Sequence, residues 1–230
     1  RSQNWIGGTR PGDAQFVPPP PEAVEGCMAE LERFLNDRGL LYPAVVRAAL
    51  AHVQFETIHP FLDGNGRIGR LLIAFILHHD GVLQRPLLYL SLYFKQHRSE
   101  YYRLLDLVRY EGEWEQWLDF FLEGVVHTAQ NAVENARRLV SLFKDDARRI
   151  QAAGRTASST LRVFEALCQR PLLTLNQARE RTGLSFPAVA KGMEALLRLG
   201  IAREMTGRKR NRVFAYSGYL ALLNEGTEPL

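Results

Sequence analysis

One twelve-residue segment, HPFLDGNGRIGR at residues 59–70, constrains this chain more than any other part of the sequence. Gly64 and Gly66 alternate with Asn65, so the backbone can adopt positive φ and turn successive N–H groups inward as a nest for an anion. The segment runs into a helical pattern near Ile68, and the positive end of a helix dipole favours phosphate at the same place. The segment therefore predicts a phosphate-binding loop.

Charged side chains in the same segment complete the predicted site. Arg67 and Arg70 are three residues apart on the expected helix, so both guanidinium groups can reach phosphate oxygens. Asp63 offers the hard oxygen ligand that Mg²⁺ prefers, at the mouth of the loop. His59 titrates near neutral pH and can accept a proton from an incoming hydroxyl. This combination predicts phosphoryl or nucleotidyl transfer, in which positioning and charge neutralisation supply most of the rate.

Residues 59–70 resemble the HPFx(D/E)GNGRxxR signature of Fic-domain proteins, which attach AMP from ATP to a hydroxyl side chain of a target protein. The resemblance extends to residues 1–8 and 16–21, which are similar to the family's flap and the proline stretch after it, and to residues 86–121, which are similar to its helices. It implies an enzyme, a protein adenylyltransferase that uses ATP as co-substrate, requires Mg²⁺ and releases pyrophosphate.

The resemblance implies a role for each motif residue. His59 would deprotonate the target hydroxyl, which then attacks the α-phosphorus of ATP. Asp63 would hold Mg²⁺ against the α- and β-phosphates. Backbone N–H groups, one side-chain amide and two guanidinium groups would bind the phosphates, and they come from Gly64, Gly66, Asn65, Arg67 and Arg70.

Four further residues receive roles through the resemblance. Ile6 and Gly7 of the flap would lie over the nucleotide and offer a backbone edge to an extended segment of the target protein. Tyr101 and Tyr102 would border the adenine and ribose. The implied partner is therefore a protein that docks on the flap.

Many Fic proteins carry an inhibitory helix with the pattern [S/T]xxxE[G/N]. In none of the Glu-Gly pairs of this chain does Ser or Thr stand four residues before the Glu. Because the sequence opens on Arg1 inside what we interpret as a structured segment, we expect the inhibitory helix to lie upstream or on a separate partner. Our hypothesis is that Arg70 is then available for the γ-phosphate.

Hydrophobic spacing predicts an all-α Fic-type domain over residues 1–150 with a small β-hairpin flap over residues 2–17. A break is expected near Gly124 in the last and longest helical pattern. The helical patterns cover about residues 22–36, 43–57, 68–80, 90–95, 99–110 and 113–151. In the third of them the residues expected to be buried are Ile68, Leu71, Leu72, Phe75 and Ile76.

A second domain is expected over residues 160–230, after a small, polar linker at residues 151–159. Three helical patterns are followed by two β-prone pieces, which matches the winged helix-turn-helix plan. The helical patterns cover residues 161–168, 175–181 and 186–199, with Ser185 as the expected N-cap of the last, and the β-prone pieces cover residues 201–205 and 212–216.

The second domain carries the positive charge of the chain. From Gly154 onward there are 12 Lys and Arg residues against 6 Asp and Glu residues, whereas the rest of the chain is slightly acidic. Candidate DNA contacts are Lys191 on the last helix and Arg208, Lys209 and Arg210 in the turn between the β-prone pieces. A solvated turn on a domain for target recruitment or dimerisation fits the same residues, so both interpretations stay open.

Two other functions remain as alternatives to the adenylyltransferase. The chain could be a DNA-binding transcriptional regulator whose Fic domain senses a nucleotide, or a de-AMPylase that uses the same site. A possible homodimer is compatible with each of these. His52 and Glu56, four residues apart, could form a metal pair, but we interpret them as a solvated helix face.

Composition excludes several other classes of protein. The apolar share of 46% and charged share of 23% are typical of a globular chain rather than a disordered one. The longest apolar runs fall far short of the roughly 20 residues that cross a bilayer, so no membrane association is expected. Cys27 and Cys168 lie far apart without a metal-like pattern, which favours reduced thiols and a cytoplasmic protein.

Overall fold

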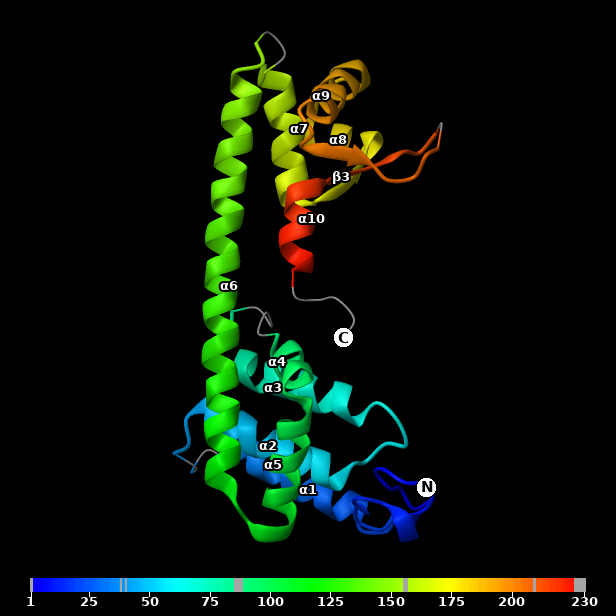
Figure 1. Ribbon diagram of the computed structural model, residues 1–230, viewed down its shortest axis with the longest axis vertical. Coiled ribbons are helices and arrows are strands. Elements are labelled where there is room, and N and C mark those ends of the chain that lie inside the picture. The colour runs from blue at the N-terminus through cyan, green and yellow to red at the C-terminus, as the bar shows by residue number, and fades with distance from the viewer. Residues whose placement is uncertain are drawn as a thin grey trace. The chain divides into compact units, whose positions relative to one another are not determined.

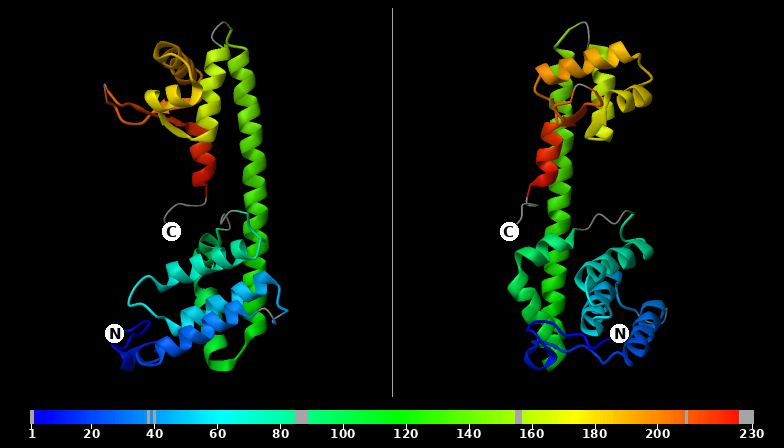
Figure 2. Two further views of the ribbon diagram at one scale, coloured as in Figure 1. Left: turned by 180° about the vertical axis from the view of Figure 1, so that it is seen from behind. Right: turned by 90° about the vertical axis from the view of Figure 1, so that its right-hand side faces the viewer.

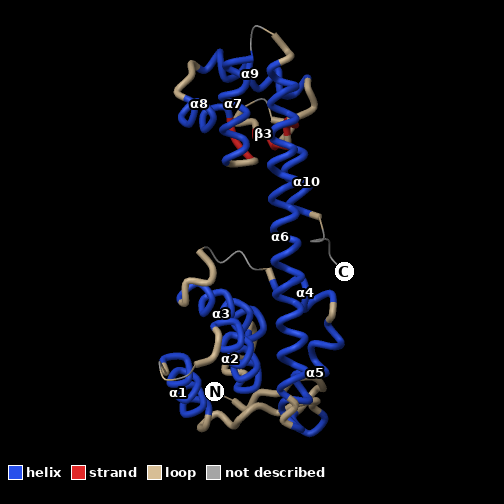
Figure 3. The backbone as a smooth tube through the Cα atoms, turned by 90° about the vertical axis from the view of Figure 1, so that its left-hand side faces the viewer, coloured by secondary structure: helices blue, strands red, loops and turns tan. Residues whose placement is uncertain are grey.

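The computed structural model describes residues 2–37, 39, 41–84, 89–154, 157–208 and 210–225 (Figure 1). The chain is mostly helical, as expected, and its described strands all lie near the C-terminal end of the sequence (Figure 3). It divides into two compact units, residues 1–130 and 131–230. The division falls within the long helix α6 (Trp114–Gln151), whereas the sequence predicted a domain limit at residue 150. None of the described helices is both long and apolar enough to cross a bilayer.

The first unit is built around helix α2, which is buried on nearly every side. The small residues Ala48, Ala49 and Ala51 are fully buried, and Phe55 and Ile58 complete its apolar surface. A helix that is apolar all round needs neighbours on all sides. Those neighbours include α3 and α1. The elements of the unit are η1 (Pro11–Asp13), α1 (Val24–Asn36), α2 (Ala44–Ile58), α3 (Asn65–His79), α4 (Leu90–Gln96), α5 (Arg98–Glu111) and the start of α6.

Helix α3 buries a different face from the one predicted. Of the expected stripe, Ile76 is buried and Leu72 is half-buried, but Ile68, Leu71 and Phe75 are 39%, 48% and 55% exposed. The buried face instead follows Gly69, Ile73 and Leu77. Apolar side chains surround most of this helix, so periodicity alone could not select the face. Gly69 lies on this face, and a Cβ there would lie 2.5 Å from Oε1 of Glu56, so the absence of a side chain lets α2 approach closely.

The predicted flap is an irregular loop closed by one antiparallel β-bridge, between Ile6 and Phe16. The Ile6 N–H donates to the Phe16 carbonyl at 2.8 Å, and the Gln15 N–H donates to the Ile6 carbonyl at 2.9 Å. Gly7 and Gly8 both adopt positive φ, and a Cβ at Gly8 would lie 2.5 Å from the Asp13 carbonyl oxygen. The turn signals were therefore correct, but no regular two-stranded hairpin forms in this loop.

The predicted break near Gly124 is wrong, because α6 is continuous from Trp114 to Gln151. A glycine inside a helix costs only about 1 kcal/mol relative to alanine, which does not end a helix that is packed. Gly124 is buried, and a Cβ there would lie 2.6 Å from Cδ1 of Tyr93. The glycine therefore allows the Tyr93 ring to pack closely against α6.

We expect Gly124→Ala to lower the free energy of unfolding although alanine is the better helix former. The buried Tyr93 ring would have to move, and overpacking of this kind costs about 1–3 kcal/mol. Gly26→Ala in α1 is the matched control, because nothing lies within 4 Å of the added Cβ, and it should raise stability by up to about 1 kcal/mol. Urea unfolding of both variants measures the difference, and equal gains in stability would contradict the prediction.

The second unit combines helices with a three-stranded antiparallel sheet of order β1-β3-β2. Both strands predicted from the sequence are present, as β2 and β3. Strand β1 was not predicted, because three residues show no alternation and the strand forms by pairing with β3. The elements after α6 are α7 (Ala157–Gln169), β1 (Leu172–Thr174), α8 (Leu175–Thr182), α9 (Phe186–Arg198), β2 (Ala202–Glu204), β3 (Val213–Tyr216) and α10 (Ser217–Asn224).

The core of the second unit includes a buried polar contact between α6 and β3. The Tyr216 hydroxyl donates to Oδ2 of Asp146 at 2.7 Å, and Phe143 stacks against the Tyr216 ring. Residues 152–154 end α6 in a turn and α7 begins at Ala157, while residues 155 and 156 of the predicted linker lie outside the described residues. Ser185 occupies the N-cap position of α9, but its side chain makes no capping hydrogen bond.

Candidate active site

The loop between α2 and α3 holds the predicted catalytic residues, and His59 marks the point where α2 ends. His59 adopts a left-handed conformation with φ of 48°. Among the described non-glycine residues, only Asn211 also has a positive φ. This conformation costs about 1–2 kcal/mol for most L-residues, and such strain concentrates at functional sites. The N-terminal flap lies next to this loop, shown in blue and cyan (Figures 1 and 2).

Asn65 closes the loop through its side chain. Its Oδ1 accepts the Phe61 N–H at 2.9 Å, and its Nδ2 donates to the Phe61 carbonyl at 2.6 Å. The side chain is 2% exposed. The Asn65 side chain therefore holds the loop closed, and its contact with phosphate stays a prediction.

The two glycines lie at the start of α3, where the sequence predicted an anion nest. Gly64 is the N-cap residue with φ of 87°, and its own N–H donates to Oδ1 of Asp63 at 2.6 Å, whereas α3 has no side-chain capping hydrogen bond. Both arginines lie against these glycines: a Cβ at Gly64 would be 3.4 Å from Nη2 of Arg67, and one at Gly66 would be 3.0 Å from Nη1 of Arg70. The two guanidinium groups and the start of α3 therefore lie close to these glycines, an arrangement that favours an anionic ligand.

Each of the two arginines has a partner besides the loop. Nη2 of Arg67 is 3.2 Å from Oδ2 of Asp63, and both side chains are largely exposed, so the pair contributes at most about 1 kcal/mol and can open for a ligand. Nε of Arg70 donates to Oγ of Ser91 in α4 at 3.2 Å. Ser91 was not predicted, because nothing in the sequence links it to a loop 21 residues earlier.

The ring of His59 is oriented by the residue one turn before it. Its Nδ1 lies 3.3 Å from the Glu56 carbonyl oxygen and 3.8 Å from Oε2 of the same residue. An N–H at Nδ1 can donate to these acceptors, which makes Nε2 the nitrogen with a lone pair. Nε2 is then the atom that can take a proton from a substrate.

His52 and Glu56 do not form a solvated face, so that interpretation is wrong. His52 is 0% exposed and Glu56 is 5% exposed, because the α2 face that carries them is covered by α3 and α5. Burial raises the pKa of Glu56 to about 7, opposed by the nearby charges of Arg70 and Arg109. Burial also lowers the pKa of His52 to about 4. No cluster of three or more potential metal-ligating side chains exists among the described residues.

The flap and α5 hold the loop from outside, through residues that sequence reasoning missed. Nδ2 of buried Asn4 donates to the Phe61 carbonyl at 2.7 Å and approaches the His59 carbonyl at 3.4 Å. Arg109 of α5 donates to the Glu56 carbonyl at 3.0 Å, and its guanidinium lies 4.1 Å from the centroid of the Phe16 ring. These contacts join segments that are far apart in sequence, so no local signal could reveal them.

The structure changes the expected roles of some predicted nucleotide contacts. Tyr101 is 5% exposed and its hydroxyl lies 2.9 Å from Nε2 of His52, so it belongs to the core and is not accessible to a nucleotide. Tyr102 is 46% exposed. Ile6 has both main-chain groups bonded within the flap, so Ile6 itself cannot provide the edge that a target strand would use. Gly7 remains exposed next to it.

The predicted DNA contacts lie on the surface of the second unit. Lys191 of α9 is exposed, as are Arg208 and Arg210 between β2 and β3, whereas Lys209 lies outside the described residues. Arg212 places its guanidinium 4.9 Å from the centroid of the Phe214 ring. The β2–β3 connection is thus basic, as the sequence indicated.

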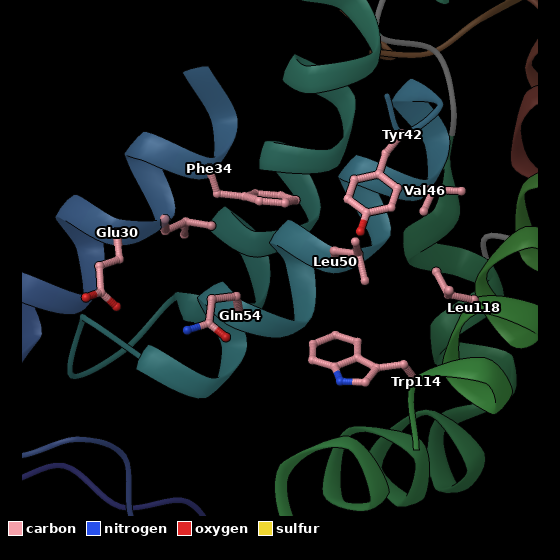
Figure 4. Close-up of a pocket in the computed structure, with 9 residues that line it drawn as sticks. Glu30, Phe34, Tyr42, Val46, Leu50, Gln54, Trp114 and Leu118 are labelled. Carbon is pink, nitrogen blue, oxygen red and sulfur yellow. The ribbon is translucent and has the colours of Figure 1, made fainter. Parts of the chain in front are cut away.

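A separate pocket of about 540 Å³ lies in the first unit (Figure 4). Apolar and aromatic side chains from α1, α2 and α6 dominate its lining, including Phe34, Leu50 and Trp114. None of the predicted site residues lines it. The loop between α2 and α3 is therefore distinct from this pocket.

Comparison with known proteins gives a family match over the part of the chain that contains this loop. Residues 1–77 match the Fic/DOC family. This Fic segment, about a third of the chain, contains the flap, α1, α2 and most of α3.

Two relatives extend the comparison beyond the Fic segment. The "Protein adenylyltransferase Fic" of Drosophila melanogaster is 37% identical over 125 residues, and that of Aedes aegypti is 36% identical over 124 residues. Each match covers 54% of this chain but only 22% of the relative's length. A crystal structure of a Fic family protein from Desulfovibrio desulfuricans G20 has a TM-score of 0.50 and 22% identity, and the match covers 88% of this chain and 57% of that one. This structural likeness supports the fold.

Proposed function

We propose that the first unit is a protein adenylyltransferase, which transfers AMP from ATP to a hydroxyl side chain of a target protein. The observation that carries the proposal is the arrangement of His59 five residues before Gly64, the N-cap residue of α3, where two guanidinium groups lie against the glycines. The match of residues 1–77 to the Fic/DOC family, and relatives that are named protein adenylyltransferases, support it.

In the proposed reaction His59 acts as general base. Its Nε2 takes the proton of the target hydroxyl while the hydroxyl oxygen forms a bond to the α-phosphorus. The bond from that phosphorus to the β-phosphate oxygen breaks, and pyrophosphate leaves. Arg67, Arg70 and the N–H groups at the start of α3 hold the negative charge of the outer phosphates throughout. The proton passes from His59 to solvent afterwards.

The residues present fit a Mg²⁺ ion that arrives with the nucleotide. Asp63 is 92% exposed at the mouth of the loop and is a hard oxygen ligand, and Mg²⁺ in nucleotide sites commonly uses one or two carboxylates together with substrate phosphates. When bound, the ion would neutralise phosphate charge. To bind the ion, Asp63 would release its contact with Arg67.

The test of the proposed function is incubation with a cell lysate, Mg²⁺ and ATP labelled on either the α- or the γ-phosphate. We expect protein-bound label from α-labelled ATP only, with mass spectrometry showing AMP on a hydroxyl side chain. Label from γ-labelled ATP would indicate a kinase, and no protein-bound label from either would reject the proposal.

We further propose that the target protein docks at the flap and that the second unit is a winged helix-turn-helix module. Exposed Trp5 and Gly7 flank the bridged Ile6, where an extended segment could pair with the backbone. Three helices with the sheet order β1-β3-β2 support the module. Cys27 and Cys168 are free thiols, which supports a cytoplasmic location.

The basic β2–β3 connection favours DNA binding by the second unit, and this makes a regulator the second candidate function. We expect Arg208→Ala/Arg210→Ala to weaken binding of duplex DNA and to reduce the salt slope by about 2, one for each phosphate contact. Arg137→Ala/Arg170→Ala, which removes two exposed arginines of the same unit, is the charge-matched control. Fluorescence anisotropy measures both, and equal affinities of the two variants would reject the DNA interface.

A further inference from the structure

Glu56 is a buried carboxyl group that the proposed reaction does not yet use. It lies one turn before His59 at the end of α2 and is 5% exposed. Its Oε2 is 3.8 Å from Nδ1 of His59, and its carbonyl oxygen is 3.3 Å from the same nitrogen. Two oxygens of one residue therefore face the ring nitrogen that does not receive the substrate proton.

The carboxyl group occupies a space that exists because residue 69 is glycine. A Cβ at Gly69 would lie 2.5 Å from Oε1 of Glu56 and 3.2 Å from Nδ1 of His52. Within the described residues Oε1 of Glu56 has no hydrogen-bond partner, which is costly for a buried polar atom. Packing and hydrogen bonding alone therefore do not explain Glu56, which indicates a role in the chemistry nearby.

The groups around Glu56 come from three helices, and among the described residues none donates a hydrogen bond to its Oε1. His52 lies on the same helix, Arg70 faces it from α3, and Arg109 and Tyr101 face it from α5. Burial raises the pKa of Glu56 to about 7, while the charges of Arg70 and Arg109 act in the opposite direction. Above about pH 7 the carboxyl group is therefore ionised, and its charge faces the ring of His59.

We propose that Glu56 is the positioning residue of His59: its carbonyl accepts the Nδ1–H, and its carboxylate balances the imidazolium that forms when Nε2 takes the proton of the target hydroxyl. The proton on Nδ1 stays in place throughout, so no proton passes to Glu56. This role rests on the proposed function, and it explains why a carboxyl group is retained in a buried position.

The direct test is an NMR titration of the His59 ring in Glu56→Gln, with the signal assigned by its loss in His59→Asn. Removing an opposite charge at this distance should move the His59 midpoint to lower pH by about one unit. Glu32→Gln, which changes an exposed carboxylate on α1, is the control and should leave the midpoint unchanged. This measurement does not depend on AMP transfer.

The kinetic test uses the same variants. In Glu56→Gln we expect kcat for AMP transfer to fall about tenfold, with KM for ATP within about twofold and the acidic limb of the rate profile at lower pH. At pH 8 the variant should be more stable than the parent, because an ionised buried carboxyl group is removed. A parent chain without AMP transfer would reject the proposed function, while the titration would still decide the role of Glu56.

Two further variants keep the inference testable if Glu56→Gln does not fold. Glu56→Asp retains the charge and should keep the His59 midpoint near that of the parent. Gly69→Ala should displace the carboxyl group through the 2.5 Å contact and shift the midpoint in the same direction as Glu56→Gln. Equal midpoints in Glu56→Gln and Glu32→Gln would overturn the inference, as would a change in KM for ATP with unchanged kcat.

Discussion

Replacing His59 by asparagine is expected to reduce AMP transfer by about 10²–10⁴-fold, the usual contribution of a general base. Asparagine is the appropriate substitute because it tolerates the left-handed conformation that residue 59 adopts, with φ of 48°. The variant should therefore fold normally and bind ATP as the parent does. Transfer is measured with α-labelled ATP, and ATP binding by calorimetry.

His79→Asn is the control for this prediction. His79 lies at the end of α3, and its side chain is 88% exposed. We expect AMP transfer by His79→Asn to equal that of the parent. Retention of full activity in His59→Asn would show that another group accepts the proton.

Asn65→Ala is expected to reduce AMP transfer by about a hundredfold or more, although the side chain contacts no substrate in the proposed reaction. The substitution leaves the Phe61 N–H without its acceptor, and a displacement of about 1 Å in a catalytic loop can cost this much. The free energy of unfolding should fall by about 1–3 kcal/mol, as for other unpaired buried groups. Urea unfolding and the transfer assay measure the two effects.

Asn65→Asp separates the two hydrogen bonds of this side chain. Aspartate can still accept the Phe61 N–H but would place a carboxylate oxygen against the Phe61 carbonyl oxygen, so AMP transfer should fall at least as far as in Asn65→Ala. Asn36→Ala, at the end of α1, removes an exposed amide that bonds only to the Glu32 carbonyl and should be neutral. Unchanged transfer in Asn65→Ala would show that the loop does not depend on this amide.

The sequence predicted the parts of the site that depend on neighbours along the chain. Gly64 and Gly66, with Arg67 and Arg70 one turn later, lie together at the start of α3 because their spacing fixes the geometry. His59 at the end of α2 was also predicted, since the helical pattern before it ends there. Local spacing is sufficient where the chain itself supplies the geometry.

The sequence could not predict contacts that tertiary packing creates. Asn4 and Arg109 reach the loop from segments about fifty residues or more away, and neither lies in a recognisable motif. Glu56 was misread because a charged residue on a helix is usually solvated, yet here α3 and α5 cover it. Tyr101 was placed at the nucleotide by the resemblance to Fic proteins, and the structure buries it in the core.

The chain turns from α2 into α3 within six residues, and this brings two helix ends of opposite sign together. His59 stands at the carboxyl end of α2, where partial negative charge favours a bound proton. The glycine nest stands at the amino end of α3, where partial positive charge favours an anion. The backbone alone therefore polarises this short stretch. In the proposed reaction, the released proton is attracted to the end of α2 and the pyrophosphate anion to the start of α3.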